Sequence, residues 1–155
     1  MKPTVPPGIE LSTDPTRLDL DLLHDFLRTS YWSPGLPRGV LERAVRGSLN
    51  FGAYEGSRQV GYLRVVSDRA TFAWICDVLV VEDRRRRGIA DALVAAVLAH
   101  PELQGLRRWS LATRDAHALY RRHGFELLAT PQWAMEIRRP DIYLVPTGGP
   151  PTSRE

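Results

Sequence analysis

The sequence predicts one domain of mixed α/β (α+β) fold. Its sheet is expected to be mostly antiparallel, with one parallel crossover. The chain has 155 residues, of which 43% are hydrophobic and 25% charged, and that balance suits one globular domain with a core. Its hydrophobic period changes in a defined order, from two helical stretches to strand-like alternation and then to a strand, a basic turn and a helix. We expect residues 1–145 to form the domain. Residues 146–155 are rich in Pro, Gly and Thr and are expected to be a disordered tail.

The first half of the chain predicts two helices followed by three antiparallel strands. Apolar residues at helical spacing predict helices over residues 18–27 and from 39 to 49, separated by a segment with two prolines and a glycine. The turn at Gly56 predicts a hairpin. The β-branched and aromatic content of residues 70–81 predicts a central strand. A short first strand is expected over residues 9–13, before the helices, and the three antiparallel strands over residues 51–54, 59–66 and 70–81.

The second half predicts a crossover helix and a second, shorter α/β unit. Residues 89–99 return to a 3.6-residue period, and Pro101 follows them. Residues 109–113 predict a strand, and Asp115 is placed to cap a short helix that ends before Gly124. A last pair of strands is expected at residues 125–129 and 133–137.

Several classes of protein are disfavoured by composition. No apolar stretch approaches eighteen residues, and prolines at positions 3, 6 and 7 interrupt any signal peptide, so we expect a cytoplasmic protein without a membrane partner. Cys76 is the single cysteine and excludes an intramolecular disulfide; its apolar surroundings favour a buried structural thiol over a nucleophile. The four histidines lack the paired spacing of a zinc site, so no metal is expected.

Four consecutive arginines, Arg84 to Arg87, lie between the central strand and the crossover helix. Such a run is compatible with a nucleic-acid patch, a solvated face or the rim of a site for a phosphate-bearing ligand. The net charge is only +3, and the acidic pair Glu82 and Asp83 directly precedes the run, which argues against nucleic acid. A helix N-terminus binds phosphate where the loop lets it approach, and Gly88 and Ala90 supply that access. The spacing is not that of a Walker loop.

Two motifs resemble the GNAT superfamily of acyl-CoA-dependent N-acetyltransferases. The first is Arg85-x-x-Gly88-x-Ala90 after a strand, and the second is the segment Ala116-His-Ala-Leu-Tyr120 that leads to Gly124-Phe125. The resemblance covers roughly residues 9–137. It implies a GNAT fold with a sheet of about seven strands and four helices, in which strands 70–81 and 109–113 form a parallel pair that splays apart.

The resemblance implies acetyl-CoA as co-substrate and assigns its site. The backbone of residues 78–80 would contact the pantetheine arm, and the amides of residues 86–91 would hold the pyrophosphate. The residues so assigned are Val78, Leu79, Val80, Arg85, Arg86, Arg87, Gly88, Ile89, Ala90 and Asp91. Two positions depart from the family: Arg86 stands where glycine is usual, and Glu82 where proline is frequent.

The implied reaction is direct transfer of the acetyl group to a primary amine of a small molecule or peptide in a ternary complex. Tyr120 aligns with the family's general acid, since a phenol stays neutral at pH 7 and can protonate a thiolate; its spacing is equally that of a packed helix residue. Asp77 and Glu82 are candidate bases, with a structural carboxylate paired to arginine as the alternative. His117 and His123 lie on an expected exposed helix, where solvated histidines are commoner.

Acceptor specificity is expected to come from the aromatic loop after the first helix, with Trp133 closing the other side. Two other functions compete with the enzyme: a catalytically inactive CoA-binding regulatory domain, and a basic nucleic-acid-binding protein. We expect no nucleic-acid partner. The sequence leaves the acceptor amine and a homodimer open.

Overall fold

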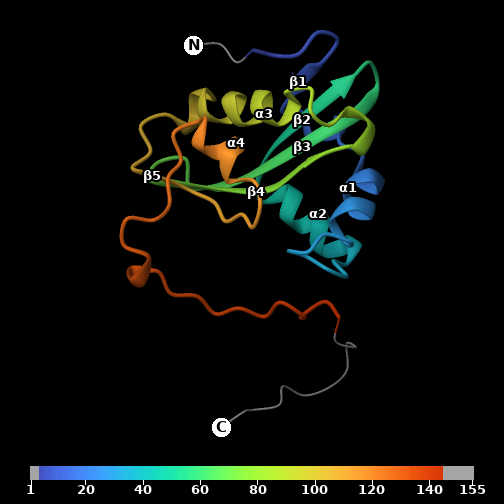
Figure 1. Cartoon of the computed structure of the whole chain (residues 1–155). Helices are drawn as coiled ribbons and strands as arrows, with labels where there is room; N and C mark the ends of the chain where they lie inside the picture. The colour runs from blue at the N-terminus through green and yellow to red at the C-terminus, as the bar shows by residue number, and fades with distance from the viewer. Residues whose placement is uncertain (1–3, 145–155) are drawn as a thin grey trace.

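A single five-stranded sheet forms the centre of the molecule (Figure 1). The computed structural model describes residues 4–144. Its strands are β1 (Glu10–Ser12), β2 (Leu49–Glu55), β3 (Arg58–Ser67), β4 (Phe72–Val80) and β5 (Arg108–Ser110). They lie in the order β1-β2-β3-β4-β5, and every neighbouring pair is antiparallel except β4 and β5, which are parallel.

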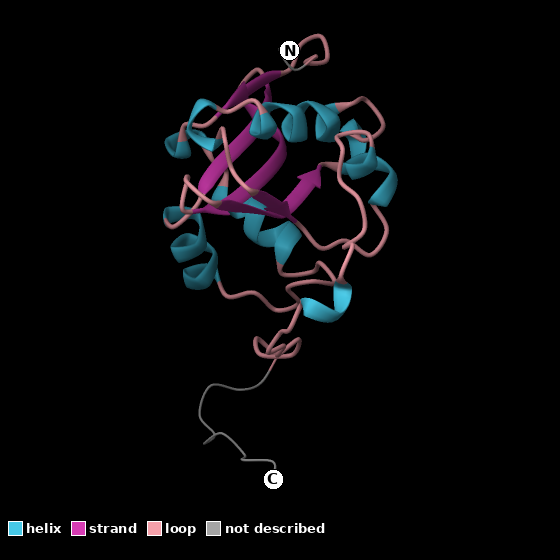
Figure 2. Ribbon diagram, turned by 90° about the vertical axis from the view of Figure 1, so that its left-hand side faces the viewer, coloured by secondary structure: helices cyan, strands magenta, loops and turns pink. Residues whose placement is uncertain are grey.

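Four α-helices cover the sheet on both faces (Figure 2). They are α1 (Leu20–Leu27), α2 (Arg38–Arg46), α3 (Ile89–Leu98) and α4 (His117–Arg121). Four short 3-10 turns accompany them: η1 (Pro15–Arg17), η2 (Glu82–Arg84), η3 (Pro101–Leu103) and η4 (Pro131–Trp133). None of the described helices is long and apolar enough to cross a membrane.

Two hydrophobic clusters hold the helices against the sheet. Leu63 and Val65 of β3 belong to the cluster that contains α3, whereas Tyr62 belongs to the cluster of α1 and α2, as strand alternation requires. Gly61 lets α3 approach β3 closely, because a Cβ there would lie 3.0 Å from Cγ2 of Ile89. The sheet is therefore buried on both faces.

The predicted element order is confirmed from the first strand to the short helix α4, with shifts at several ends. The second helix ends at Arg46 instead of residue 49, since Leu49 already pairs with Val65 as the first residue of β2. The predicted cap of α4 by Asp115 is wrong: Ala116 is the N-cap, no side chain caps the helix, and Asp115 pairs with Arg114.

The prediction of about seven strands is wrong, because residues 125–129 and 133–137 are not strands in this structure. Among the described residues, the backbone bonds of this segment are local ones, such as that from the Trp133 amide to the Thr130 carbonyl. The chain leaves α4 as an extended arm (orange to red in Figure 1). A strand needs a neighbour for its backbone groups, and no described strand pairs with this segment. The expected tail at 146–155 lies outside the described residues.

Candidate functional site

The parallel strands β4 and β5 separate soon after they meet. Only Phe72, Ala73 and Trp74 pair with β5, which ends at Ser110, while β4 continues to Val80. From residue 75 onward, no described strand pairs with this edge of β4. The predicted splayed pair is thus present, and residues 78–80 lie along its open edge. Their side chains pack in the two core clusters, which leaves the backbone as the part that can bind a ligand.

The turn after β4 leads into helix α3, whose N-terminus is not capped by any side chain. Gly88 is the N-cap of α3 with φ +80°. Among the described residues, none of the backbone N–H groups of residues 86–91 donates to a protein acceptor. Unpaired amides and the helix dipole favour an anion at this end. The open edge of β4 therefore leads directly to a potential phosphate site.

The four arginines have different surroundings. Arg84 binds Glu55 Oε2 through Nε at 3.0 Å and Nη2 at 2.7 Å, and it also binds Asp83. Arg85 donates from Nε to the Val80 carbonyl at 3.1 Å. Arg86 and Arg87 are exposed. Arg84 and Arg85 thus hold the turn in place. The side chains of Arg86 and Arg87 are exposed at the surface of the same turn.

The acids beside the turn are largely occupied. Asp83 accepts two bonds of 2.9 Å from Arg58, and this guanidinium lowers the pKa of the Asp83 carboxyl. Asp91 accepts from Arg122 at 2.9 Å and lies 3.1 Å from His123 Nε2, so it ties the start of α3 to the end of α4. The bond from Arg122 is the main cause of a lowered Asp91 pKa. The amide of Asp91 has no protein acceptor among the described residues, while its carboxylate is engaged by Arg122 and His123.

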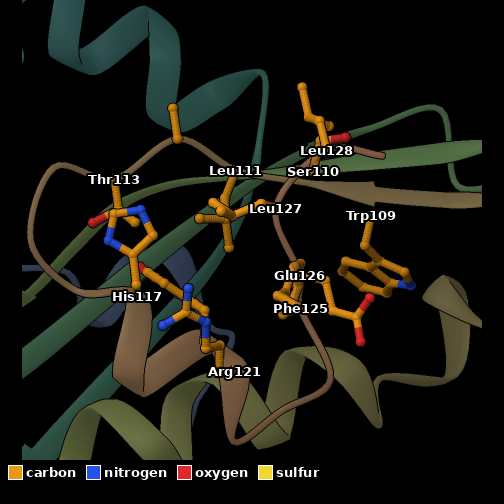
Figure 3. Close-up of a pocket in the computed structure, with 12 residues that line it drawn as sticks. Trp109, Ser110, Leu111, Thr113, His117, Arg121, Phe125, Glu126, Leu127 and Leu128 are labelled. Atoms are coloured by element: carbon orange, nitrogen blue, oxygen red, sulfur yellow. The ribbon is translucent and has the colours of Figure 1, made fainter. Parts of the chain in front are cut away.

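A pocket of about 260 Å³ opens between β5, α4 and the start of the arm (Figure 3). Its lining residues are Trp109, Ser110, Leu111, Ala112, Thr113, His117, Tyr120, Arg121, Phe125, Glu126, Leu127 and Leu128. Tyr120 is only 8% exposed, and burial raises its pKa to about 12. Its ring also contacts Phe125 edge-on, with centroids 5.9 Å apart. Tyr120 is therefore both a packed residue and a neutral hydrogen-bond donor beside a cavity.

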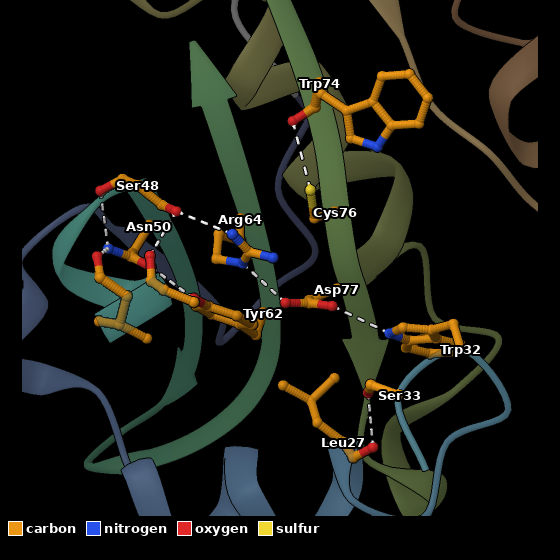
Figure 4. A network of polar contacts seen from close by, with 12 residues as sticks. Leu27, Trp32, Ser33, Ser48, Asn50, Tyr62, Arg64, Trp74, Cys76 and Asp77 are labelled. Carbon is orange, nitrogen blue, oxygen red and sulfur yellow. Dashed lines mark hydrogen bonds and ion pairs between the residues drawn. The ribbon is translucent and has the colours of Figure 1, made fainter. Parts of the chain in front are cut away.

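Asp77 is held in a network of polar contacts (Figure 4). One carboxylate oxygen accepts from Arg64 Nε at 2.8 Å and the other from Trp32 Nε1 at 3.0 Å. The Arg64 and Asp77 side chains are only 16% and 12% exposed. Asp77 has φ +53° at a bulge where β3 and β4 change register. These contacts fit the structural alternative for Asp77, because both oxygens already serve as acceptors.

The other titratable candidates lie apart from this network. Glu82 is exposed in η2 and makes no ion pair among the described residues. His117 lines the Tyr120 pocket, and His123 bonds to Asp91, so neither is simply solvated. Cys76 is half-buried, and burial raises the pKa of its thiol. The sequence offered no signal for Arg64 as the partner of Asp77, since the two residues meet only through the pairing of β3 with β4.

The aromatic loop reaches the β5 side of the molecule, but Trp133 does not. The Tyr31 hydroxyl accepts from the Arg114 amide at 3.1 Å, and the Arg114 guanidinium lies 3.9 Å above the Tyr31 ring. Trp32 packs edge-on against Tyr31 at 5.0 Å. Trp133 is 79% exposed on the arm, so the expectation that it closes the site is not met within one chain.

Comparison with known proteins identifies the fold. A family model described as "Acetyltransferase (GNAT) domain" matches residues 46–127, more than half of the chain. A crystal structure of a GNAT-family protein from Xanthomonas campestris pv. campestris is 46% identical over 91% of this chain and all of that chain, with a TM-score of 0.88. A Gibberella zeae protein that carries the name of an acetyltransferase is 29% identical over 133 residues, 71% of this chain and 74% of its own.

More distant structures share the fold. An acetyltransferase structure from Clostridium acetobutylicum, solved with acetyl-CoA, has a TM-score of 0.61 at 12% identity over 84% of this chain and 96% of its own. The matched domain contains β4, the glycine turn, α3 and the Tyr120 helix. By its sequence and its architecture, this chain belongs to the GNAT family of acetyltransferases.

Proposed function

We propose that the protein is an N-acetyltransferase that transfers the acetyl group of acetyl-CoA to a primary amine of a small molecule or peptide. The observation that carries the proposal is the series of unpaired amides at residues 86–91, at the end of an open strand edge. This arrangement offers N–H donors to a pyrophosphate and backbone groups to an extended, amide-containing arm. The acetyl-CoA found in the distant Clostridium structure supports the same choice.

We assign binding to the backbone, with three arginines in supporting roles. Residues 78–80 would contact the pantetheine arm along β4, and residues 86–91 would hold the pyrophosphate. Arg85 would act on the site indirectly, since its bond to the Val80 carbonyl fixes the turn against the strand. The exposed Arg86 and Arg87 would add attraction for the phosphates.

The proposed chemistry places the thioester near Tyr120. The neutral amine attacks the carbonyl carbon, a nitrogen–carbon bond forms, and the carbon–sulfur bond breaks with its electron pair on sulfur. The amine proton leaves to a base, and Tyr120 donates to the departing sulfur. Because its pKa is raised to about 12, Tyr120 keeps its proton at neutral pH. Its main contribution is therefore a hydrogen bond that strengthens as negative charge develops on sulfur.

The base is the less defined part of the mechanism. Asp77 and Glu82 are the candidates, and of the two Glu82 has the carboxylate without an ion-pair partner among the described residues. Glu82→Gln should slow turnover without weakening acetyl-CoA binding if that carboxylate accepts the amine proton. Unchanged turnover would leave water or the substrate itself in that role.

Acetyl-CoA binding provides the direct test of the proposal. Gly88→Glu should abolish it, because the side chain would stand at the amides and strain a φ of +80°. Gly56→Glu is the matched control: Gly56 has φ +60° and open space around it, but lies in the β2–β3 turn. Isothermal titration measures both variants. Equal loss in the two, or no binding by the wild type, would contradict the proposed site.

Two further measurements separate the competing functions. Screening primary amines for CoA release tests the reaction, and an enzyme should release CoA in an amine-dependent way. A protein that binds CoA but releases none with any amine would be a regulatory domain instead. Thermal stabilisation by duplex DNA, without any by acetyl-CoA or CoA, would favour the nucleic-acid alternative.

A further inference from the structure

Asp91 connects the helix that begins at the proposed phosphate site with the helix that carries the proposed acid. It lies in the first turn of α3, and its amide is one of the unpaired N–H groups of residues 86–91. Tyr120 lies in α4, which packs beside α3 (Figure 1). The Asp91 side chain bonds to the two residues that directly follow α4. One residue therefore contacts both parts of the proposed site.

The contact between Asp91 and the end of α4 uses both carboxylate oxygens. Arg122 donates to Oδ1 from Nε at 3.1 Å and to Oδ2 from Nη2 at 2.9 Å, so its planar guanidinium meets the carboxylate at two points. His123 Nε2 lies 3.1 Å from Oδ1. We call Asp91, Arg122 and His123 the Asp91 clamp. Arg122 also donates from Nη1 to the Ala118 carbonyl of α4 at 3.2 Å, so one guanidinium is bonded to both helices.

Helix α4 has little support of its own. It spans five residues and has no side-chain cap, and a helix this short is not stable in isolation. The Tyr120 carbonyl accepts bonds from the amides of His123 at 3.0 Å and Phe125 at 3.1 Å. His123 is thus bonded to the Tyr120 backbone and to Asp91. A shift of Asp91 would reach Tyr120 through two hydrogen bonds.

The charge of Asp91 needs compensation if a diphosphate binds at the start of α3. A carboxylate in the first turn of a helix interacts with the same positive end that would attract the phosphates, and it would repel them. The guanidinium of Arg122 offsets that charge. Arg122 therefore has two effects, one on the charge beside the phosphates and one on the geometry of α4, and different substitutions separate them.

We propose that the Asp91 clamp couples diphosphate binding at the start of α3 to the placement of the Tyr120 hydroxyl. The clamp residues are positioning residues, and this role rests on the proposed function. Phosphates bonded to the amides of residues 86–91 fix the backbone that carries Asp91, and the clamp transmits this constraint to α4. The coupling is reciprocal, so a fixed α4 also favours the arrangement of Asp91 that suits the phosphates.

Turnover and affinity respond differently to the clamp variants. Asp91→Asn breaks the ion pair and removes the charge beside the phosphates, so kcat should fall about 10-fold while the Kd of acetyl-CoA should not rise. Arg122→Gln leaves the carboxylate uncompensated and should lower kcat and raise Kd. Arg122→Lys keeps the charge without the two-point contact, so it should lower kcat alone. A proportional loss of affinity and turnover in Asp91→Asn would overturn the proposal.

A matched control is available at the other end of the sheet. Arg17 donates to Glu10 from Nη1 at 2.6 Å and Nη2 at 3.4 Å, in a partly exposed pair between η1 and β1. Arg17→Lys makes the same chemical change as Arg122→Lys, and it should alter neither kcat nor Kd. An equal fall of kcat in the two variants would refute a specific role for the clamp.

A residue that acts through Tyr120 should have no effect once the Tyr120 hydroxyl is absent. In a Tyr120→Phe background, Asp91→Asn should therefore change kcat by less than about 2-fold, because the effects of coupled residues are not additive. A further loss of about 10-fold in the double variant would show that Asp91 acts independently of Tyr120 and would overturn the proposal.

Amide hydrogen exchange with CoA tests the coupling without turnover. In the wild type, CoA should slow exchange at residues 86–91 and also at the His123 and Phe125 amides that bond to Tyr120. In Asp91→Asn, CoA should slow exchange at residues 86–91 only. If wild-type protection were confined to residues 86–91, the coupling would be wrong while the proposed cofactor site would stand. If CoA protected neither region, the coupling and the proposed function would both fail.

Discussion

Two residues of the turn before α3 adopt left-handed backbone conformations. Gly88, with φ +80°, does so without cost because it lacks a Cβ. Arg86, with φ +61°, does so at a cost of about 1 kcal/mol. The glycine that the family usually has at this position is thus explained by the backbone, and the arginine keeps the turn while adding charge.

Arg86→Gly should therefore stabilise the protein by up to about 1 kcal/mol, since the strain of a left-handed arginine is relieved. Urea denaturation measures the change in the free energy of unfolding. Arg87→Gly serves as the control, because Arg87 is not among the residues with positive φ and its replacement should bring no gain. An equal shift in both variants would mean that charge, and not backbone strain, governs the effect.

Tyr120 should matter for turnover more than for binding. Tyr120→Phe removes the donor to the departing sulfur and should lower kcat by about 100-fold, while the dissociation constant of acetyl-CoA changes little. Tyr54→Phe is the control, because the Tyr54 hydroxyl is buried without a partner and its loss should leave activity intact. Steady-state kinetics and titration together decide, and unaltered turnover in Tyr120→Phe would remove it from the mechanism.

The pH dependence of kcat and of folding stability also tests the role of Tyr120. With its pKa raised to about 12, Tyr120 stays protonated from pH 7 to 10, so it should cause no fall in kcat over that range. Above about pH 10 the unfolded chain loses this proton while the folded protein keeps it, and stability should decline toward pH 12. A loss of kcat below pH 9 that disappears in Tyr120→Phe would contradict this assignment.

At the scale of elements, one ion pair connects three parts of the fold. Arg64 of β3, Asp77 of β4 and Trp32 of the α1–α2 loop are joined by bonds of 2.8 and 3.0 Å. Arg64 also donates to Ser48 Oγ at 3.1 Å, just before β2. The network thereby fixes the aromatic loop relative to the bulge where β4 departs from its regular pairing.

Asp77→Asn should cost about 3 kcal/mol of folding stability, because it leaves the largely buried Arg64 without a counter-charge. Asparagine tolerates the left-handed backbone of this position, so the charge is the main change. Asp25→Asn, which breaks the exposed pair with Arg28, should cost under about 1 kcal/mol. If Asp77→Asn instead kept its stability and lost turnover, Asp77 would be acting as the base.

At the scale of the whole molecule, the domain presents an open sheet edge and an apolar arm at the same time. Residues 133–137 have the alternating pattern of a strand, but they do not form a strand in this structure. Trp133, Met135 and Ile137 have the right spacing, yet a strand forms only where a neighbour accepts its backbone bonds. Neither the pattern nor the motifs indicate whether that neighbour is the same chain or another.

The sequence by itself determined what depends on local spacing. The order of helices and strands, the glycine turn from Arg85 to Ala90 and the helix with Tyr120 follow from period and motif, because these features are set within a few residues. The tertiary structure decided which distant groups meet. Only the register of β3 and β4 brings Arg64 to Asp77, and only the end of β5 opens the edge of β4. The sheet order also shows that residues 125–129 and 133–137 do not join the described sheet.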